Sequence, residues 1–441
     1  MVEPFCAIYK PTNSVCTTVS DMLQMQHAKV SGKKMTVAKK VETQESWSAT
    51  LPQQTADTGE KAAVELSLVE SAEGFAELAE GWLVLEAQLD ETFSYFQSFN
   101  WCYSWWQHIG ENADAQLKIF VLRRGHNLLA VWPLQLTSLS FGVKALTPLT
   151  YPHSEYSSAL FHKDLSEADC KRFVDEVLEQ VDCDLVTLAK IPSGTRFQKA
   201  SAGLGVDAPI EEVASVFEFA DYQNKDDYLA SLSTSTRRSR KKRRNKLNKL
   251  GEVSYKITQP GEFGYTDLIE RALEMKFEWL EHTGRNDEKL KIEGLKQTLA
   301  GLASDGANQA LVQSLMVDDR PVAIEIGFLQ GGHYYAYVGA FDWDMRDYSV
   351  GKVQMEQAVL WAIENGVEKY DLLAEPAGYK DSWSNLVVTL QNRTIARSIK
   401  GQLYGVVWQH HVRPRVKALF NNLPSDWRTK ALNVKKALGR S

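Results

Sequence analysis

The residues best suited to chemistry lie at the start of an amphipathic helix expected over residues 350–365. Ser349 stands at the capping position of that helix, and Gly351 lies in its first turn. Free backbone N–H groups and the positive end of the helix dipole favour a bound phosphate at such a start. Gly351 has no Cβ to block the close approach of a pyrophosphate, and Lys352 adds a positive charge. The same residues would also suit an ordinary capped helix.

Five further side chains could take part in acid–base chemistry or bind charge: Glu325, Asp371, Glu375, Tyr379 and Lys380. Glu325 is the one charge in an apolar strand, where a carboxylate is costly unless it is paired or at work. Asp371 and Glu375 flank the end of a short strand, and ligands of open α/β sheets usually bind at such ends. The ordinary alternatives are a solvated sheet face for Glu325, capping or salt bridges for the two acids, and a surface pair for Tyr379 and Lys380.

The elements that must position these residues occur in two similar series. Each series has a strand, a polar turn and a return strand, followed later by a helix and a short Asp-Leu strand. The first series is expected at 117–122, 128–136, 166–181 and 184–188, and the second at 311–316, 322–328, 333–341, 350–365 and 370–373. The pattern predicts two copies of one α/β unit.

Two motifs resemble a known group of enzymes. The spacing Arg346-x-x-Ser349-x-Gly351 resembles the Arg/Gln-x-x-Gly-x-Gly/Ala pyrophosphate motif of GNAT acyltransferases, with Ser in place of the first Gly. The block Asp371-Leu372-Leu373, Glu375, Tyr379-Lys380 and Trp383 is similar to the BioF-like, or CelD-type, acetyltransferase domain family. The extra Pro376-Ala377-Gly378 spacing departs from that family.

The resemblance extends over residues 64–400. It implies an α/β (α+β) fold of tandem GNAT-like units, each a mixed, mainly antiparallel sheet flanked by helices, related to the FemAB aminoacyl transferases. It also implies an acyl-CoA co-substrate, held at Arg346 and Ser349–Lys352, with its pantetheine along the strand His333–Phe341. Tyr335 and Tyr337 share one face of that strand and could line the acyl channel, although the pattern favours buried core aromatics.

The reaction implied is direct acyl transfer from the thioester to an amine, which needs no covalent intermediate. Glu325, Asp371 or Glu375 would act as the base, Tyr379 would protonate the leaving thiolate, and Lys380 would bind a phosphate or carboxylate. The first unit opens its helix with Ser166-Glu167-Ala168-Asp169, whose acids would repel a phosphate. We therefore expect that unit to have lost CoA binding and to shape the acceptor site.

The division of the chain follows from length and composition. With 441 residues and a net charge of −6, the sequence suggests two domains plus extensions. We expect a disordered extension over 1–62, an N-terminal unit over 63–222, a catalytic unit over 223–400 and basic helices over 401–441, with one basic helix linking the units over 227–250. The basic stretch Arg237–Lys249 could bind tRNA, clamp a phosphate-bearing substrate or form a solvated face. Residues 401–441 could lie on an anionic membrane or pack as ordinary helices.

The sequence points away from secretion and from metal binding. The five cysteines form no CxxC pair, the histidines show no ligand spacing, and the N-terminus lacks a signal-peptide pattern. We expect a cytoplasmic protein without a metal, and a location at the inner membrane surface is an alternative. The resemblance suggests an acceptor amine on a sugar or on a cell-envelope or exopolysaccharide precursor. The alternatives are a FemAB-like aminoacyl-tRNA-dependent transferase and a non-catalytic binding protein that retains the fold.

Overall fold

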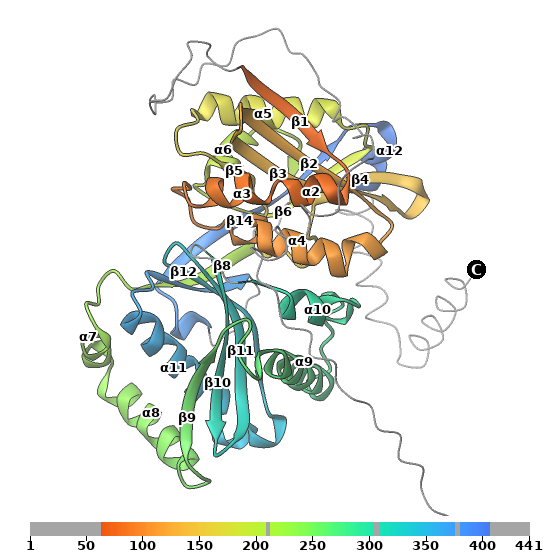
Figure 1. The fold of residues 1–441 in the computed structure, drawn as a ribbon. Coiled ribbons are helices and arrows are strands. Elements are labelled where there is room, and N and C mark those ends of the chain that lie inside the picture. Colours follow the sequence, from red (N-terminus) through yellow and green to blue (C-terminus); the bar gives the residue numbers. More distant parts are fainter. Residues whose placement is uncertain (1–62, 209–211, 304–307, 375–379, 406–441) are drawn as a thin grey trace, which may run out of the picture.

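The computed structural model describes residues 63–208, 212–303, 308–374 and 380–405. Its strands form one 14-stranded sheet in the order β1-β2-β3-β4-β6-β14-β8-β13-β12-β11-β10-β9, with β5 beside β3 and β7 beside β14. The sheet continues through both halves of the chain, which form the upper and lower lobes in Figure 1.

The elements of the first half are β1 (Val64–Val69), α2 (Ala72–Glu77), α3 (Ala79–Glu86), α4 (Phe99–His108), β2 (Ala115–Arg124), β3 (Asn127–Leu139), β4 (Val143–Pro148), β5 (Leu160–Phe161), α5 (Glu167–Gln180), β6 (Leu185–Pro192), α6 (Arg196–Ala200), β7 (Val206–Asp207) and β8 (Glu212–Glu218). Those of the second half are α7 (Lys225–Ser231), α8 (Thr234–Leu247), β9 (Val253–Thr258), α9 (Tyr265–His282), α10 (Leu295–Ala300), β10 (Asn308–Val317), β11 (Arg320–Gln330), β12 (His333–Phe341), α11 (Val350–Glu364), β13 (Lys369–Ala374), β14 (Leu386–Ala396) and α12 (Ile399–Gln402).

The two halves repeat one arrangement of strands. In the first half, β2, β3 and β4 are antiparallel neighbours, and α5 connects them to β6, which runs parallel to β4. In the second half, β10, β11 and β12 are antiparallel, and α11 leads to β13, which runs parallel to β12. The predicted fold class, an α/β tandem of related units with mixed, mainly antiparallel sheets, is confirmed.

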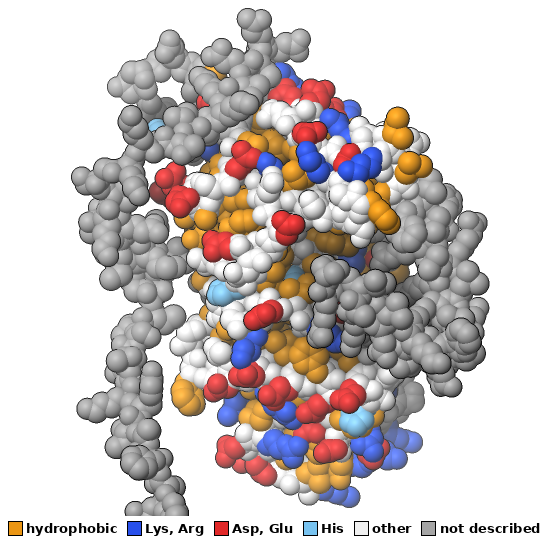
Figure 2. Space-filling view, turned by 90° about the vertical axis from the view of Figure 1, so that its right-hand side faces the viewer, with side chains coloured by type: hydrophobic (Ala, Val, Ile, Leu, Met, Phe, Trp, Pro, Cys, Tyr) orange, Lys and Arg blue, Asp and Glu red, His pale blue; other side chains and the backbone are white. Residues whose placement is uncertain are grey.

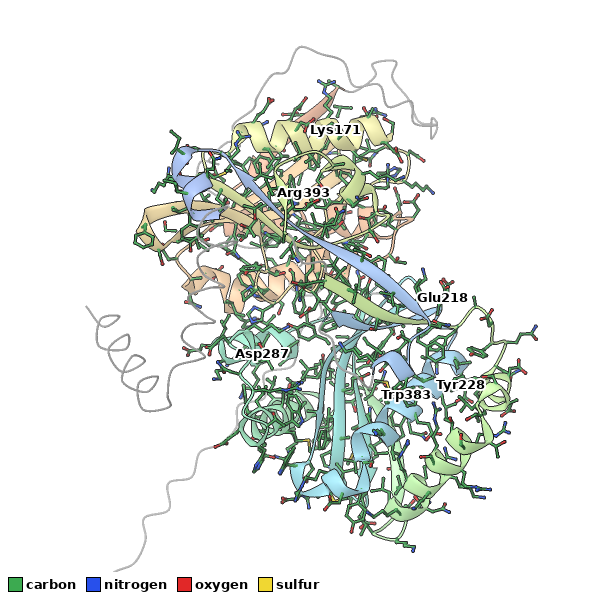
Figure 3. The ribbon with its side chains drawn as sticks, turned by 180° about the vertical axis from the view of Figure 1, so that it is seen from behind. Lys171, Glu218, Tyr228, Asp287, Trp383 and Arg393 are labelled. Atoms are coloured by element: carbon green, nitrogen blue, oxygen red, sulfur yellow. The ribbon has the colours of Figure 1, made fainter. Side chains whose placement is uncertain are left out.

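The halves also exchange strands. Strand β8 follows the first unit in sequence but pairs with β13 of the second, and β14 follows the second unit but pairs with β6 of the first. The two exchanged strands pair with each other as well. Figure 3 shows them crossing between the lobes. The proposed boundary at 222/223 therefore divides the chain but not the sheet.

Both faces of strands such as β2 and β3 are buried, and these strands carry apolar residues at odd and even positions. In β2, Ile119 and Val121 face the aromatic helix α4, whereas Phe120 and Leu122 face α5. The cluster around α4 continues onto β10–β12, α9 and α10 of the second half. Ser104 Oγ of α4 donates a hydrogen bond to the carbonyl of Thr298 in α10 at 2.8 Å, so the halves share one core.

Two helical segments are interrupted. The expected helix over 227–250 is two helices, α7 and α8, because Leu232 is extended and the Ser233 hydroxyl accepts a hydrogen bond from the N–H of Thr236, at 3.1 Å, to start α8. Likewise, 72–89 holds α2 and α3, with a break at Leu78. The expected extension 1–62 lies outside the described residues, as do residues 406–441 of the expected C-terminal helices.

Candidate active site

A gap in strand pairing opens beside β12. The parallel ladder of β12 and β13 holds only three pairs and ends at Tyr335–Asp371, while β12 continues to Phe341. Beyond Asp371 the backbone of β13 is irregular, and Leu373 adopts a left-handed φ of 61°. Among the described residues, no strand pairs with the edge of β12 beyond Tyr335 on the β13 side, so an extended ligand could bind to the backbone there.

A β-bulge lies on the same stretch of β12. Ile326 of β11 pairs with Val338, but the next residue, Gly327, pairs with Ala336, so Tyr337 is the extra residue. Bulges leave a residue unpaired and are frequent next to active sites. The ring of Tyr337 packs against Trp101 at 5.5 Å between centroids, and its hydroxyl donates to the carbonyl of His153 at 3.3 Å. Its side chain is thus part of the core between the halves, while its peptide group lies at the gap.

The start of α11 has the expected residues but a different cap. Ser349 has φ 56° and ψ 39°, which is left-handed, and its side chain makes no capping hydrogen bond. Ser349 is thus at the expected N-cap position, but its hydroxyl does not cap the helix, because a left-handed backbone does not present it to the first-turn N–H groups as an extended N-cap does. Such a conformation is strained for Ser and common for Gly, which fits the Gly of the motif that Ser349 replaces.

Gly351 is half-buried at this helix start and lies beside Phe341. A Cβ placed there would meet Phe341 Cδ1 at 3.6 Å, an ordinary contact, so the protein's own packing does not require glycine. Lys352 is exposed beside it. Arg346, in the short 3-10 helix η5 (Trp343–Tyr348), donates to the carbonyl of Trp343 at 3.1 Å and stacks on that ring. The phosphate-binding candidates therefore gather around one exposed helix start.

Glu325 lies in a buried polar cluster on the sheet face that α11 covers. Tyr334 donates to its carboxylate at 3.0 Å, and Tyr370 donates a second hydrogen bond. Burial raises the pKa of Glu325 to about 7, although the two tyrosine hydrogen bonds oppose this shift. Gln313 is its direct neighbour on β10. The carboxyl can thus hold or release a proton near neutral pH, but it is enclosed.

Asp371 lies on the opposite face, at the point where β12 and β13 separate. Its carboxylate accepts hydrogen bonds from Tyr156 at 2.7 Å and from the N–H of Leu373 at 2.7 Å, and it lies 3.1 Å from His333 Nε2. His333 stacks on Tyr335, whose hydroxyl accepts from the N–H of Phe93. Because Tyr156 and Phe93 belong to the first half, this cluster joins the two halves at the base of the gap.

Lys380 has a position that favours a structural role. Its side chain is buried, and its ammonium donates to the carbonyls of Leu372, Leu373 and Ala374 at 2.7, 3.2 and 3.2 Å. It thereby holds the irregular exit of β13. The other two residues predicted from the same block, Glu375 and Tyr379, lie outside the described residues.

The partners of Glu325 and Asp371 could not be predicted from local sequence patterns. Tyr334 and Tyr370 are read as core aromatics in their strands, and Tyr156 lies more than 200 positions from Asp371 in a polar stretch between strands. Only the alternation of strand faces could have grouped Tyr334 with Tyr370. Within the described ranges, no three His, Cys, Asp or Glu side chains gather as a metal site, and no helix is long and apolar enough to cross a membrane.

Comparison with known families bears on the second half of the chain. Residues 234–381, which contain α8, the gap and the start of α11, match the model of the acetyltransferase (GNAT) domain. This segment of the chain is similar to the GNAT acetyltransferase domain. No curated protein matches the sequence. The finer assignment to the BioF-like, CelD-type group stays a prediction.

Several solved structures are similar to the domain and the half before it. FemX has 11% identity and a TM-score of 0.49, over 75% of this chain and 98% of its own. A C-terminal domain (DUF2156) from Agrobacterium fabrum has 10% identity and a TM-score of 0.48, over 77% of this chain and 98% of its own. A tandem GNAT protein from the clavulanic acid biosynthesis pathway has 12% identity and a TM-score of 0.41, over 76% of this chain and 99% of its own. Because these identities and scores are low, function has to be argued from the chain's own residues.

Proposed function

We propose that the protein is an acyl-CoA-dependent N-acyltransferase. The observation that carries the proposal is the joint presence, inside the GNAT segment, of the gap between β12 and β13 and the open helix start at Gly351. The pyrophosphate would lie on the N–H groups of Val350–Lys352, and the pantetheine would extend along β12 to the bulge at Tyr337. An unpaired peptide group at the bulge would bind the thioester carbonyl.

Asp371 is the better candidate for the base. The transfer needs a group that takes a proton from the attacking ammonium, after which the amine nitrogen bonds to the thioester carbon and the thiolate leaves. Both carboxyls are buried, but Asp371 lies where the strands separate, with His333 beside it, whereas Glu325 lies under α11 and accepts from two tyrosines. Tyr156 would act as a positioning residue by holding the Asp371 carboxylate.

The first half would complete the acceptor site. Its segment 153–156 reaches the second half through Tyr156 and through Glu155, which forms buried ion pairs with Lys190 and with Lys289 of the second half. The helix start of the first unit instead carries Glu167 and Asp169, and Ser166 caps it by accepting from the N–H of Asp169. This supports a single CoA site per chain. An amine of a sugar or cell-envelope precursor as acceptor rests on the resemblance alone.

Titration calorimetry with acetyl-CoA and, separately, with total tRNA tests the proposal. Acetyl-CoA is expected to bind at one molecule per chain. Gly351→Ala should weaken it at least tenfold, while thermal stability stays equal or rises slightly, because alanine favours a helix by about 1 kcal/mol and its Cβ fits at 3.6 Å. Binding of tRNA but not acetyl-CoA would favour an aminoacyl-tRNA-dependent transferase. Binding of neither would favour a non-catalytic protein, and two CoA molecules per chain would contradict the loss of the first site.

A further inference from the structure

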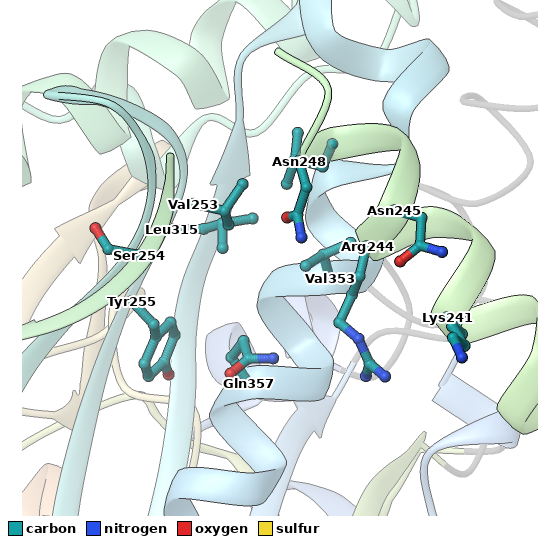
Figure 4. A pocket seen from close by; sticks show the side chains of 11 residues that line it. Lys241, Arg244, Asn245, Asn248, Val253, Ser254, Tyr255, Leu315, Val353 and Gln357 are labelled. Carbon is teal, nitrogen blue, oxygen red and sulfur yellow. The ribbon is translucent and has the colours of Figure 1, made fainter. Parts of the chain in front are cut away.

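A cleft of about 490 Å³ lies between α8, α11 and the strands β9 and β10 (Figure 4). Its floor is largely apolar and includes Leu315, Val353 and the ring of Tyr255. Its polar wall comes mainly from α8. Pockets of this size commonly hold small organic ligands on an apolar lining with a few polar groups. None of the residues placed in the gap between β12 and β13 contributes to it, so the cleft is a separate concavity of the same domain.

The cleft begins close to the open helix start. Val353 and Gln357 line it from α11, about 5 and 10 Å along the helix axis from Val350 at 1.5 Å per residue. Helix α8 is fixed at the same end of α11, because Lys246 Nζ donates to the carbonyl of Asp347 at 2.8 Å. Leu247 packs with Val353 in one buried cluster. The cleft therefore lies about one to two helical turns from Val350 along α11.

The wall of the cleft is cationic. Helix α8 contains no acidic residue, whereas acidic and basic side chains intermix on the face of the molecule seen in Figure 2. Lys241 is exposed at the cleft, and within the described part of the chain no carboxylate lies within ion-pair distance of it. Arg244 is held in place by an ion pair with Glu356, which is only 1% exposed. Asn245, Asn248 and Gln357 add amide donors and acceptors.

We infer that this cleft binds the adenosine 3′-phosphate end of CoA, an inference that rests on the proposed function. The 3′-phosphate is a dianion that suits Lys241 and Arg244. The planar adenine suits the floor of Tyr255, Val353 and Leu315, and the amides can bind its edge and the ribose. The diphosphate at Gly351 and the 3′-phosphate at α8 would then hold the nucleotide at two points, which sets the direction of the pantetheine arm along β12.

The test compares CoA with dephospho-CoA, which lacks only the 3′-phosphate, by calorimetry on the full chain. The wild-type protein is expected to bind CoA about tenfold more tightly than dephospho-CoA. Lys241→Ala should weaken CoA binding about five- to tenfold and leave dephospho-CoA binding unchanged. Lys242→Ala is the matched control, because Lys242 is the adjacent exposed lysine of α8 and does not line the cleft. It should change neither affinity by more than twofold.

The outcomes separate this inference from the function on which it rests. Equal wild-type affinity for the two ligands overturns the cleft assignment and leaves CoA binding intact. An equal loss of CoA affinity in Lys241→Ala and Lys242→Ala also overturns it, because the effect would then be one of general charge. If neither ligand binds the wild-type protein, the proposed function itself fails. Binding of 3′,5′-ADP that competes with CoA and is weakened by Lys241→Ala alone would support the assignment directly.

Discussion

At the scale of single residues, the two buried carboxyls show how surroundings divide similar groups into different roles. Asp371 accepts hydrogen bonds from Tyr156 and from the backbone N–H of Leu373, so its charge is compensated. Glu325 also has two tyrosine donors, but burial raises its pKa to about 7. The surroundings of Asp371 suit a charged group at a reaction site, whereas those of Glu325 make the stability of the fold depend on pH.

We expect Glu325→Gln to flatten the dependence of stability on pH. The pKa of Glu325 is about 7 in the folded protein and near 4.5 when unfolded, so its contribution is fully present below pH 4.5 and is lost as pH rises through 7. At about 1.4 kcal/mol per pKa unit, the unfolding free energy of the wild type should fall by about 2 to 3 kcal/mol between pH 5 and 8. That of the variant should not show this fall. Urea midpoints of both proteins at the two pH values measure the difference.

Glu281→Gln, at an exposed site on α9, is the control for that measurement. Its midpoints should follow those of the wild type, because an exposed carboxyl has little differential interaction between the folded and unfolded states. Parallel curves for Glu325→Gln and the wild type would show that the carboxyl does not titrate in this range, and the enclosed cluster would need another explanation.

The residue types at the site could be predicted from the sequence better than their contacts. The glycine of the helix start and the unusual charge of Glu325 are local signals, visible in a strand or a helix turn. The left-handed backbone of Ser349 was missed because a Ser before a helix predicts a side-chain cap. The hydrogen bond from Tyr156 to Asp371 joins residues of different units, and no local pattern encodes such a pairing.

At the scale of elements, α8 is held against the domain by Arg and Lys side chains, although a run of basic residues predicts a solvated helix. Arg240 is buried, with its guanidinium 4.2 Å from the ring centroid of Trp383 and 5.5 Å from that of Tyr228. Both rings are labelled near α8 in Figure 3. Arg244 forms an ion pair with Glu356 of α11, and Lys246 donates to the carbonyl of Asp347 in η5. The basic run thus has an inward side that packs and an outward side that is free to bind anions.

Arg240→Ala should therefore loosen α8 where an outward change does not. Removing the guanidinium leaves a cavity between the two rings and loses a desolvated cation–π contact, so we expect a cost of about 2 kcal/mol in unfolding free energy. Hydrogen exchange along α8 should accelerate in parallel. Arg238→Ala, an exposed arginine on the same helix, should stay within about 0.5 kcal/mol of the wild type. Equal effects of the two substitutions would mean that the ring contacts add nothing.

The regular elements around the site were within reach of the sequence, and the connecting strands were not. The hairpins β2–β3 and β10–β11 and the helix α11 show the expected periodicities and are confirmed near the expected positions. The strands β8 and β14 were not predicted. Their partners are set by the assembled sheet rather than by an adjacent hairpin, so nothing in the local sequence states which unit each one joins.

At the scale of the whole molecule, the strand exchange makes the two halves one folding unit. Each half supplies the strand that covers the edge of the other, and the cluster around α4 and α10 buries apolar side chains from both. The gap at β13 lies next to β8, a strand of the first half. The geometry of the candidate site therefore depends on the complete sheet.

A chain cut at 222/223 should consequently fold only as a pair of fragments. Residues 63–222 alone would expose the edge of β6 and leave β8 unpaired, and uncovered edges promote aggregation. Residues 223–441 alone would lose the β8 partner of β13 and, with it, Tyr156 at Asp371. Co-expressed fragments should co-purify at one to one and bind acetyl-CoA, whereas each fragment alone should be insoluble or lack a cooperative transition. A soluble 223–441 fragment that unfolds cooperatively and binds acetyl-CoA as the intact chain does would show that the exchange is dispensable and that the catalytic unit stands alone.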